Sequence, residues 1–501
     1  MIRLAIIFLL ISIIEIKSCS FSINEVTELK RLFNESERDM ELATRNQNEN
    51  AAILLGNARC GKSTLINYLM GNELKAYKKN DEIKIRKANE NSPGPEIGAG
   101  SVSVTTIPTK WNSTRTELEN LDIWDTAGFV DNRNEMQDIN NAFHLYHLTK
   151  KVDSLKLILV ISYGEITSGN VNQILSLLKT LEGYFNNRLK DIFPSISVII
   201  SKAPDQINNN YPVDSEFLNY KLNTNLLSSS QLDISEVSKD FVRHLINNNQ
   251  RVAFFRKVKK LGKVTSAIDD NIISAIKNCD SIRKPFHQDI GFTFSVNSKN
   301  CLQKTNDDLL NMNDFLNLIS LMNNRYNETY NYLKKSLDRE VLLQKMSSFE
   351  DIYRHIDISS LDNSDANSKI KILKESDNTM KDFIVEKNLE NKISLTEFID
   401  SIIPSGKIRR INILLEAIVK LLYDRTSVLI SICKLNVNNI TAGEFDKKSE
   451  ETLQSQNATI NILKEKMEKE KIPKQEEGTW NRVFRTIGTE RPRGFRIGPG
   501  R

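Results

Sequence analysis

The feature that most constrains this chain is a glycine-rich segment set between an apolar run and a helical pattern. Residues 56–63 read GNARCGKS and fit G-x-x-x-x-G-K-[ST] at every fixed position. The apolar run 51–55 precedes this segment, and apolar residues at helical spacing over 65–70 follow it. A strand, a tight turn and a helix in this order are typical of a phosphate-binding loop. The segment therefore predicts an α/β fold with a nucleotide phosphate site.

Each position of this loop has an expected role. Gly56 and Gly61 let the backbone wrap closely, so that successive N–H groups point at phosphate oxygens. The helix that begins near Lys62 adds its N-terminal dipole. We expect Lys62 to reach the β- and γ-phosphates and the Ser63 hydroxyl to coordinate Mg²⁺. The predicted nucleotide-binding residues of the loop are Gly56, Asn57, Ala58, Arg59, Cys60, Gly61, Lys62, Ser63 and Thr64.

A second motif lies at the end of another expected strand, residues 121–124, which is followed by Asp125-Thr126-Ala127-Gly128. In phosphate-loop folds an acidic residue at this place holds Mg²⁺, often through water. The backbone N–H of Gly128 is expected to meet the γ-phosphate. Loss of that phosphate would release the following loop, which is how a switch reports hydrolysis. Asp125 and Gly128 therefore join the predicted nucleotide site.

The two motifs together resemble the translation-factor-related class of GTPases. Within that class, GKSTLINYLMGNEL at 61–74 is similar to septins and immunity-associated GTPases. The stretch GSVSVTTIPTKW at 100–111 is similar to the first switch of that group and of guanylate-binding proteins, and 125–148 is similar to immunity-associated GTPases. The resemblance covers roughly residues 50–260. It implies a P-loop GTPase fold, a mostly parallel sheet with helices on both faces, that binds GTP or GDP with Mg²⁺.

In such proteins a switch threonine closes over Mg²⁺ and the γ-phosphate. Thr105 and Thr106 are the candidates and Thr105 is preferred, while the alternative is that both belong to an ordinary edge strand. The resemblance thus gives Lys62, Thr105 and Gly128 as catalytic residues. It gives Ser63, Thr105 and Asp125 as the metal ligands.

Two departures from the family pattern affect function. Phe129 stands where Ras-type GTPases carry a glutamine that orients the attacking water, so we expect hydrolysis that is slow or stimulated by assembly. Arg59 or Arg133 could supply a stabilising charge, and either is equally well a solvated side chain. The guanine motif [NT]-K-x-D is replaced by Ser201-Lys202-Ala203-Pro204-Asp205, in which Ser201 replaces Asn or Thr and the aspartate comes one residue late.

Lys202 and Asp205 remain the predicted base contacts, and guanine is preferred over adenine on family likeness. An ATP-binding P-loop NTPase is one alternative. A nucleotide-bound scaffold with negligible turnover is another. Self-association through the G domain is an expected way to complete the site.

The rest of the chain is expected to be mostly helical. The predicted segments are a signal peptide at 1–20, an N-terminal helical lead-in at 21–47, the G domain at 48–265, an α-helical region at 266–479 and a basic disordered tail at 480–501. Residues 453–472 form either a short coiled coil or one more exposed helix. The helical region is a candidate surface for a membrane or protein partner.

The leader at 1–20 favours the secretory pathway or an endomembrane, and a cytoplasmic location is the alternative because most such switches work there. An uncleaved anchor or a packed apolar start is also compatible with the leader. The five cysteines show no C-x-x-C, so we expect neither a zinc site nor a disulfide framework, and at most one disulfide among the three cysteines of the body. A net charge of +5 over 501 residues gives no reason to expect nucleic acid as a partner.

Overall fold

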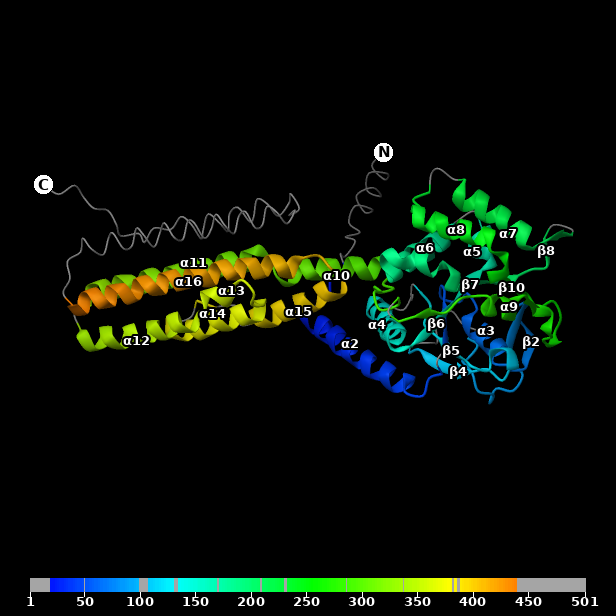
Figure 1. Cartoon of the computed structure of the whole chain (residues 1–501), viewed down its shortest axis with the longest axis horizontal. Coiled ribbons are helices and arrows are strands. Elements are labelled where there is room, and N and C mark those ends of the chain that lie inside the picture. The colour runs from blue at the N-terminus through cyan, green and yellow to red at the C-terminus, as the bar shows by residue number, and fades with distance from the viewer. Residues whose placement is uncertain are drawn as a thin grey trace, which may run out of the picture. The chain divides into compact units, whose positions relative to one another are not determined.

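The structure is a computed structural model of the chain (Figure 1). It describes residues 19–438 except 49, 99–106, 130–133, 169–170, 208–209, 229–231, 285, 337, 381–382 and 385–387. The predicted switch threonines Thr105 and Thr106, Arg133, the leader through residue 18, the 453–472 segment and the basic tail all lie outside these residues.

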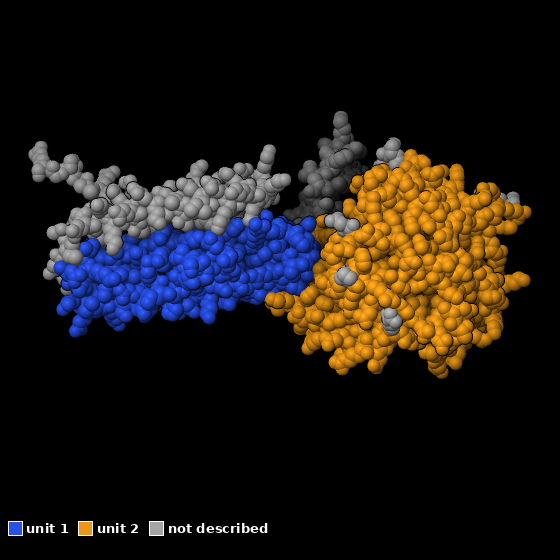
Figure 2. Space-filling view, in the orientation of Figure 1, with its two compact units in different colours: residues 1–23, 302–501 blue, residues 24–301 orange. Residues whose placement is uncertain are grey.

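The chain divides into two compact units, residues 24–301 and residues 1–23 with 302–501 (Figure 2). The first unit is built on an eight-stranded sheet in the order β12-β10-β7-β6-β1-β5-β4, with β13 pairing to β6. Its parallel strands are β1 (Asn50–Leu55), β5 (Leu121–Asp125), β6 (Ser154–Ser162), β7 (Ile196–Ala203) and β10 (Val252–Arg256). The antiparallel strands are β4 (Thr109–Asn112), β12 (Asp269–Asp270) and β13 (Ile282–Arg283). The predicted α/β class with a mostly parallel sheet is therefore confirmed.

Both faces of this sheet are buried, which explains why its central strands are almost continuously apolar. Ala51, Ile53 and Leu55 of β1 belong to one apolar cluster, whereas Ala52 and Leu54 belong to another. The first cluster includes side chains of α4 (Glu135–Lys151), α6 (Asn172–Phe185), α7 (Ser215–Leu222) and α8 (Glu236–Asn247). The second includes those of α3 (Lys62–Leu69) and α9 (Ile272–Lys277). Successive residues of the strand thus pack against the helical layers on opposite faces of the sheet.

Two smaller sheets and two further helices complete this unit. The hairpin β2 (Leu74–Lys79) and β3 (Glu82–Lys87) is joined by β11 (Gly262–Lys263), and β8 (Gln206–Ile207) pairs with β9 (Tyr211–Pro212). Helix α2 (Ile23–Thr44) lies within the predicted lead-in, and the short α5 (Tyr163–Thr167) follows β6. The unit extends to residue 301 rather than to the predicted 265, because β12 and β13 pair with strands of the main sheet.

The second unit is helical, in agreement with the predicted C-terminal region. From 296 to 438 the helices are α10 (Val296–Leu309), α11 (Met312–Lys335), α12 (Arg339–His355), α13 (Ile358–Leu361), α14 (Ala366–Met380), α15 (Leu389–Ile402) and α16 (Lys407–Asn438). Helix α16 contacts α11, α12, α14 and α15, and its apolar side chains share one cluster with theirs. Among the described helices, none combines the length and apolar character that crossing a membrane requires.

The cysteines are in two chemical states. Cys19 and Cys301 are each disulfide-bonded, and Cys60, Cys279 and Cys433 are buried free thiols. The sequence allowed for a disulfide only among the three body cysteines, so the involvement of Cys19 was missed.

Candidate functional site

The 56–63 loop leaves β1 and enters α3, as the sequence predicts, and its backbone needs glycine. Gly56 and Gly61 have φ values of 145° and 106°. A Cβ on Gly56 would lie 2.3 Å from the carbonyl oxygen of Val160 on the neighbouring strand β6. Arg59 also adopts a positive φ of 63° without being glycine. The loop is therefore a tight, conformationally costly turn that its surroundings must hold in place.

Side chains hold this loop through its carbonyl oxygens. Lys62 Nζ donates to the carbonyls of Gly56 and Asn57 at 3.0 and 3.1 Å. Lys202 Nζ donates to the carbonyl of Arg59 at 2.7 Å, and the Ser201 hydroxyl donates to that of Cys60. With these carbonyls engaged, the N–H edge of the loop is the side that can stabilise an anion.

Ser63 and Asp125, which the sequence proposes as metal ligands, come together from different elements. Ser63 opens the first turn of α3, and Asp125 ends β5, which pairs with β1. The Ser63 hydroxyl donates to Asp125 Oδ2 at 3.4 Å, and Asp125 is 1 % exposed. A hydroxyl and a carboxylate beside a lysine form the hard oxygen donor set that Mg²⁺ takes together with phosphate oxygens. The residues present fit that ion.

The segment after Asp125 lies directly against the 56–63 loop. Phe129 N–H donates to the Gly56 carbonyl at 3.0 Å, and Ala58 N–H donates to the Phe129 carbonyl at 3.3 Å. A Cβ on Gly128 would lie 2.5 Å from both N and Cα of Ala58. The Gly128 backbone is thus placed beside the loop, while the Phe129 side chain is buried and offers no polar group.

A cavity of about 830 Å³ runs from this motif pair to the β2–β3 hairpin. Lys62, Ser63, Thr64 and Gly128 line it at one end. Its other walls come from the hairpin, from Glu96 to Gly98, from Ser201 and Lys202, and from residues 255–258 at and after the end of β10. All of the main-sheet loops involved follow carboxyl ends of parallel strands, where open α/β sheets bind ligands. We name this cavity the main groove.

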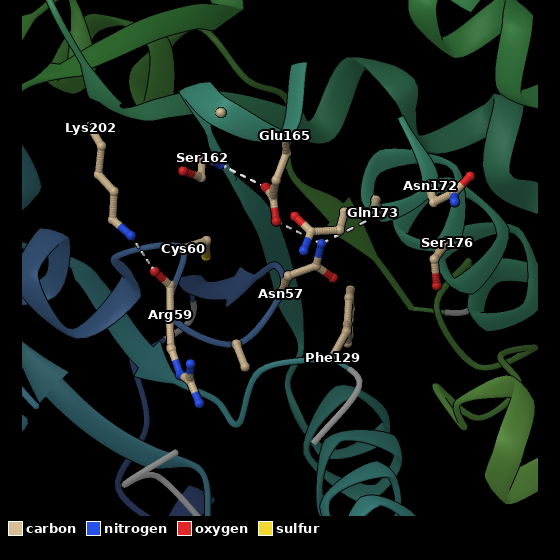
Figure 3. A pocket seen from close by; sticks show the side chains of 12 residues that line it. Asn57, Arg59, Cys60, Phe129, Ser162, Glu165, Asn172, Gln173, Ser176 and Lys202 are labelled. Carbon is tan, nitrogen blue, oxygen red and sulfur yellow. Dashed lines mark hydrogen bonds between the residues drawn. The ribbon is translucent and has the colours of Figure 1, made fainter. Parts of the chain in front are cut away.

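A second cavity, of about 480 Å³, lies on another side of the same loop (Figure 3). Asn57, Arg59, Phe129 and Glu165 contribute to its lining. Glu165 is buried, and its Oε1 accepts from Asn57 Nδ2 at 2.8 Å while its Oε2 accepts from Ser162 N–H at 2.7 Å. Sequence reasoning missed Glu165, because a single glutamate in a helical stretch gives no signal of a contact 108 residues away.

The predicted base contacts separate in the structure. Lys202 lines the main groove beside Ser201. Asp205 is absent from the groove lining, and its carboxylate forms an ion pair with Lys259. Cys60, inside the loop, is buried, and burial raises the pKa of its thiol. The thiol is therefore a packing group at neutral pH.

His144 and His147 take packing positions on α4. His144 Nε2 lies 3.4 Å from Asp39 of α2, and the His147 ring lies 4.7 Å from that of Phe33, measured between centroids. Burial lowers the pKa of His147 to about 4. Neither histidine lines the main groove.

Comparison of this chain with models of known protein families finds no match, and comparison with curated proteins finds none either. The structure defines the class of the protein. It is an α/β protein with a mostly parallel sheet and a helical C-terminal region. A glycine-containing loop and an acidic strand end meet at one edge of the sheet.

Proposed function

We propose that this chain is a P-loop GTPase of the switch or assembly kind, which binds GTP or GDP with Mg²⁺ in the main groove. The observation that carries the proposal is that Lys62 and Ser63 line one end of that groove, and that the Ser63 hydroxyl there donates to the buried Asp125. A cation, a hydroxyl and a carboxylate are the groups that a nucleotide–Mg²⁺ complex requires. The strand-loop-helix order supports the same interpretation.

In this proposal Lys62 exchanges its loop carbonyls for phosphate oxygens when the nucleotide binds. Ser63 and Asp125 would hold Mg²⁺, whose charge would offset the negative charge of the phosphates. The Gly128 backbone lies against Ala58, and we propose that its N–H meets a terminal phosphate. Thr105, outside the described residues, remains the proposed third metal ligand.

Hydrolysis is proposed to be slow in the isolated chain. The buried phenyl ring of Phe129 cannot orient water by hydrogen bonding. Arg59 lines both cavities, and its guanidinium is the proposed source of additional positive charge for the phosphates. Stimulation by a second copy of the chain would show as a turnover number that rises with protein concentration.

The test is a competition titration on the purified chain. Labelled GTP with Mg²⁺ is challenged with unlabelled GTP, GDP and ATP, beside Lys62→Ala and a surface control, Lys239→Ala. We expect GTP and GDP to compete, ATP not to, and Lys62→Ala to bind at least about 100-fold more weakly, since charge-assisted contacts to phosphate are lost. Circular dichroism checks that the variants are folded. Unchanged binding by Lys62→Ala would reject the site.

An ATP-binding NTPase is the second candidate. It is favoured by one observation: Asp205, the predicted guanine contact, pairs with Lys259 and does not line the groove. ATP outcompeting GTP would establish this candidate, whereas equal competition by ATP would leave only a P-loop nucleotide site without guanine preference. Stoichiometric GTP binding without phosphate release at any protein concentration would instead support a nucleotide-bound scaffold.

A further inference from the structure

The small sheet β11-β2-β3 carries a row of three cations across one face. Its register places Lys75 of β2 directly opposite Arg86 of β3 on one side and Lys263 of β11 on the other. Residues that are directly opposite in antiparallel strands lie on the same face of the sheet, and all three side chains are exposed. Like charges in this arrangement destabilise a sheet. The row is therefore better explained by a negatively charged partner than by the stability of the sheet.

The carboxylates near this row neutralise it only in part. Glu73 pairs with Lys263, and a carboxylate oxygen of Glu90 lies 3.4 Å from the guanidinium of Arg86. Both pairs are exposed to solvent, where an ion pair contributes little. Lys75, at the centre of the row, forms no hydrogen bond or ion pair with any other described residue. Its charge is thus available to a partner.

The segment that leads into β11 extends the positive charge. Residues 256–263 read RKVKKLGK, with five cations and no carboxylate. Lys260 of this segment and Lys79 of β2 also form no hydrogen bond or ion pair with another described residue. Lys79 lies on the same face as Lys75, because the two are four residues apart in one strand.

We name these residues the basic surface: Lys75, Lys79, Arg86, Lys260 and Lys263. None of the five lines the main groove. The basic surface is therefore separate from the proposed nucleotide site, although β2 and β3 contribute other side chains to that groove.

Apolar side chains are exposed beside this charge. Leu261, directly after Lys260, is 58 % exposed. Tyr211 of β9 is 60 % exposed, and β9 pairs with β8 in the segment whose Asp205 forms an ion pair with Lys259. Exposed leucine and tyrosine among lysines are typical of a surface that lies on lipid headgroups, where apolar groups enter the interface and cations meet phosphates. A soluble anion would engage the lysines and leave Leu261 in water.

We propose that the basic surface binds the headgroups of an anionic lipid bilayer, with Leu261 entering the interface. The sheet β11-β2-β3 then presents its row of cations to the bilayer. The proposal does not depend on the proposed function, because it requires no nucleotide. Its test is accordingly made without nucleotide, so that failure of one proposal leaves the other unaffected.

Vesicle sedimentation of the purified full chain provides the test. Vesicles of phosphatidylcholine with about 30 % phosphatidylserine are compared with vesicles of phosphatidylcholine alone. We expect binding only to the anionic vesicles, and weaker binding as the salt concentration rises. Replacing Lys75, Lys79 and Lys260 together by glutamine should weaken binding about 100-fold, because each cation near an anionic leaflet contributes about fivefold. Leu261→Ser should weaken binding by about threefold or more, since burial of its apolar surface is lost.

The matched control replaces three other exposed lysines by glutamine, Lys179 of α6, Lys277 of α9 and Lys371 of α14, which gives the same net charge. It should bind within about threefold of wild type, because charges beyond a Debye length are screened. Circular dichroism and thermal melting check that both triple variants are folded.

Three results would overturn the proposal. One is equal loss of binding, or no loss, in the two triple variants. Another is equal binding to vesicles with and without phosphatidylserine, which would show that the basic surface is not what holds the chain on lipid. The third is binding to polyglutamate or single-stranded RNA without binding to anionic vesicles, which would assign the surface to a soluble polyanion instead.

Discussion

Asn57, the second residue of the 56–63 loop, is joined to Glu165 of α5 by a 2.8 Å hydrogen bond from its side-chain amide (Figure 3). The other oxygen of Glu165 accepts the N–H of Ser162 at the end of β6. A buried carboxylate thus ties the start of the loop to the neighbouring strand end. Each carboxylate oxygen of Glu165 accepts one of these two hydrogen bonds.

Replacing this carboxylate by an amide should loosen the loop. Glutamine offers one acceptor oxygen, so Glu165→Gln leaves either Asn57 or Ser162 facing an N–H₂ group. The loss of a buried hydrogen bond should cost about 1–3 kcal/mol of unfolding free energy. Urea denaturation measures that cost, and nucleotide titration measures the accompanying loss of affinity.

A double-mutant cycle distinguishes a specific Glu165–Asn57 interaction from a general loss of stability. If Glu165 acts through Asn57, the effects of Glu165→Gln and Asn57→Ala on nucleotide affinity should be less than additive when combined. Simple additivity would mean that Glu165 supports only the α5 turn and not the loop.

Gly56→Ala should be severely destabilising. Its added Cβ would lie 2.3 Å from the Val160 carbonyl, on a backbone whose φ of 145° only glycine adopts readily. We expect a loss of about 3 kcal/mol or more, as other large backbone effects cause. Gly164→Ala is the matched control, because a Cβ there meets nothing within 4 Å. Thermal melting of both variants provides the measurement, and equal melting temperatures would contradict the close approach of β6 to Gly56.

Stability should fall on mild acidification, partly through His147. Burial lowers its pKa from 6.5 to about 4, and the smaller effects are those of Glu37, which raises the pKa, and Lys151, which lowers it further. Between these two pH values the unfolded chain binds more protons than the folded chain, so unfolding free energy rises with pH through this window. The contribution is present above pH 6.5 and is lost as pH falls toward 4.

Urea midpoints at pH 7.5 and pH 5 measure this dependence. His147→Gln should reduce the difference between the two pH values by roughly 1–2 kcal/mol, allowing for partial solvation. His244 and His287, whose pKa values burial also lowers, should leave a residual dependence. An unchanged pH dependence in His147→Gln would show that His147 titrates normally.

Thiol labelling should distinguish two classes of cysteine. In denaturant without reductant, Cys60, Cys279 and Cys433 should react, and Cys19 and Cys301 should react only after reduction. A structural disulfide is typical of oxidising compartments, so this result would favour the secretory location that the leader predicts. Mass spectrometry of the labelled chain reads each site directly. Five reactive thiols before reduction would contradict the disulfide.

The elements predicted with success are those whose signal is local. The apolar runs at 51–55 and 121–124 fall within β1 and β5, because buried parallel strands need continuous apolar residues. The helical spacing over 65–70 coincides with the end of α3. In contrast β12 and β13 are two-residue strands with polar members, and no periodicity marks them. The predicted unit therefore ended too early.

The candidate site divides in the same way. The approach of Ser63 to Asp125 could be predicted from the sequence, because the neighbouring strands β1 and β5 bring their carboxyl ends to one edge of the sheet. The Glu165–Asn57 hydrogen bond and the Asp205–Lys259 ion pair could not be predicted, since each depends on where distant segments meet.

The sequence by itself determined the α/β class, the loop that requires glycine and the polar residues that lie beside that loop. These features follow from strand and helix periodicity and from backbone sterics, which are local properties. Only the tertiary structure decided which carboxylates face the groove and which are held elsewhere. Ion pairs and hydrogen bonds between segments far apart in the chain select those positions, and their geometry exists only after the sheet and its hairpins have formed.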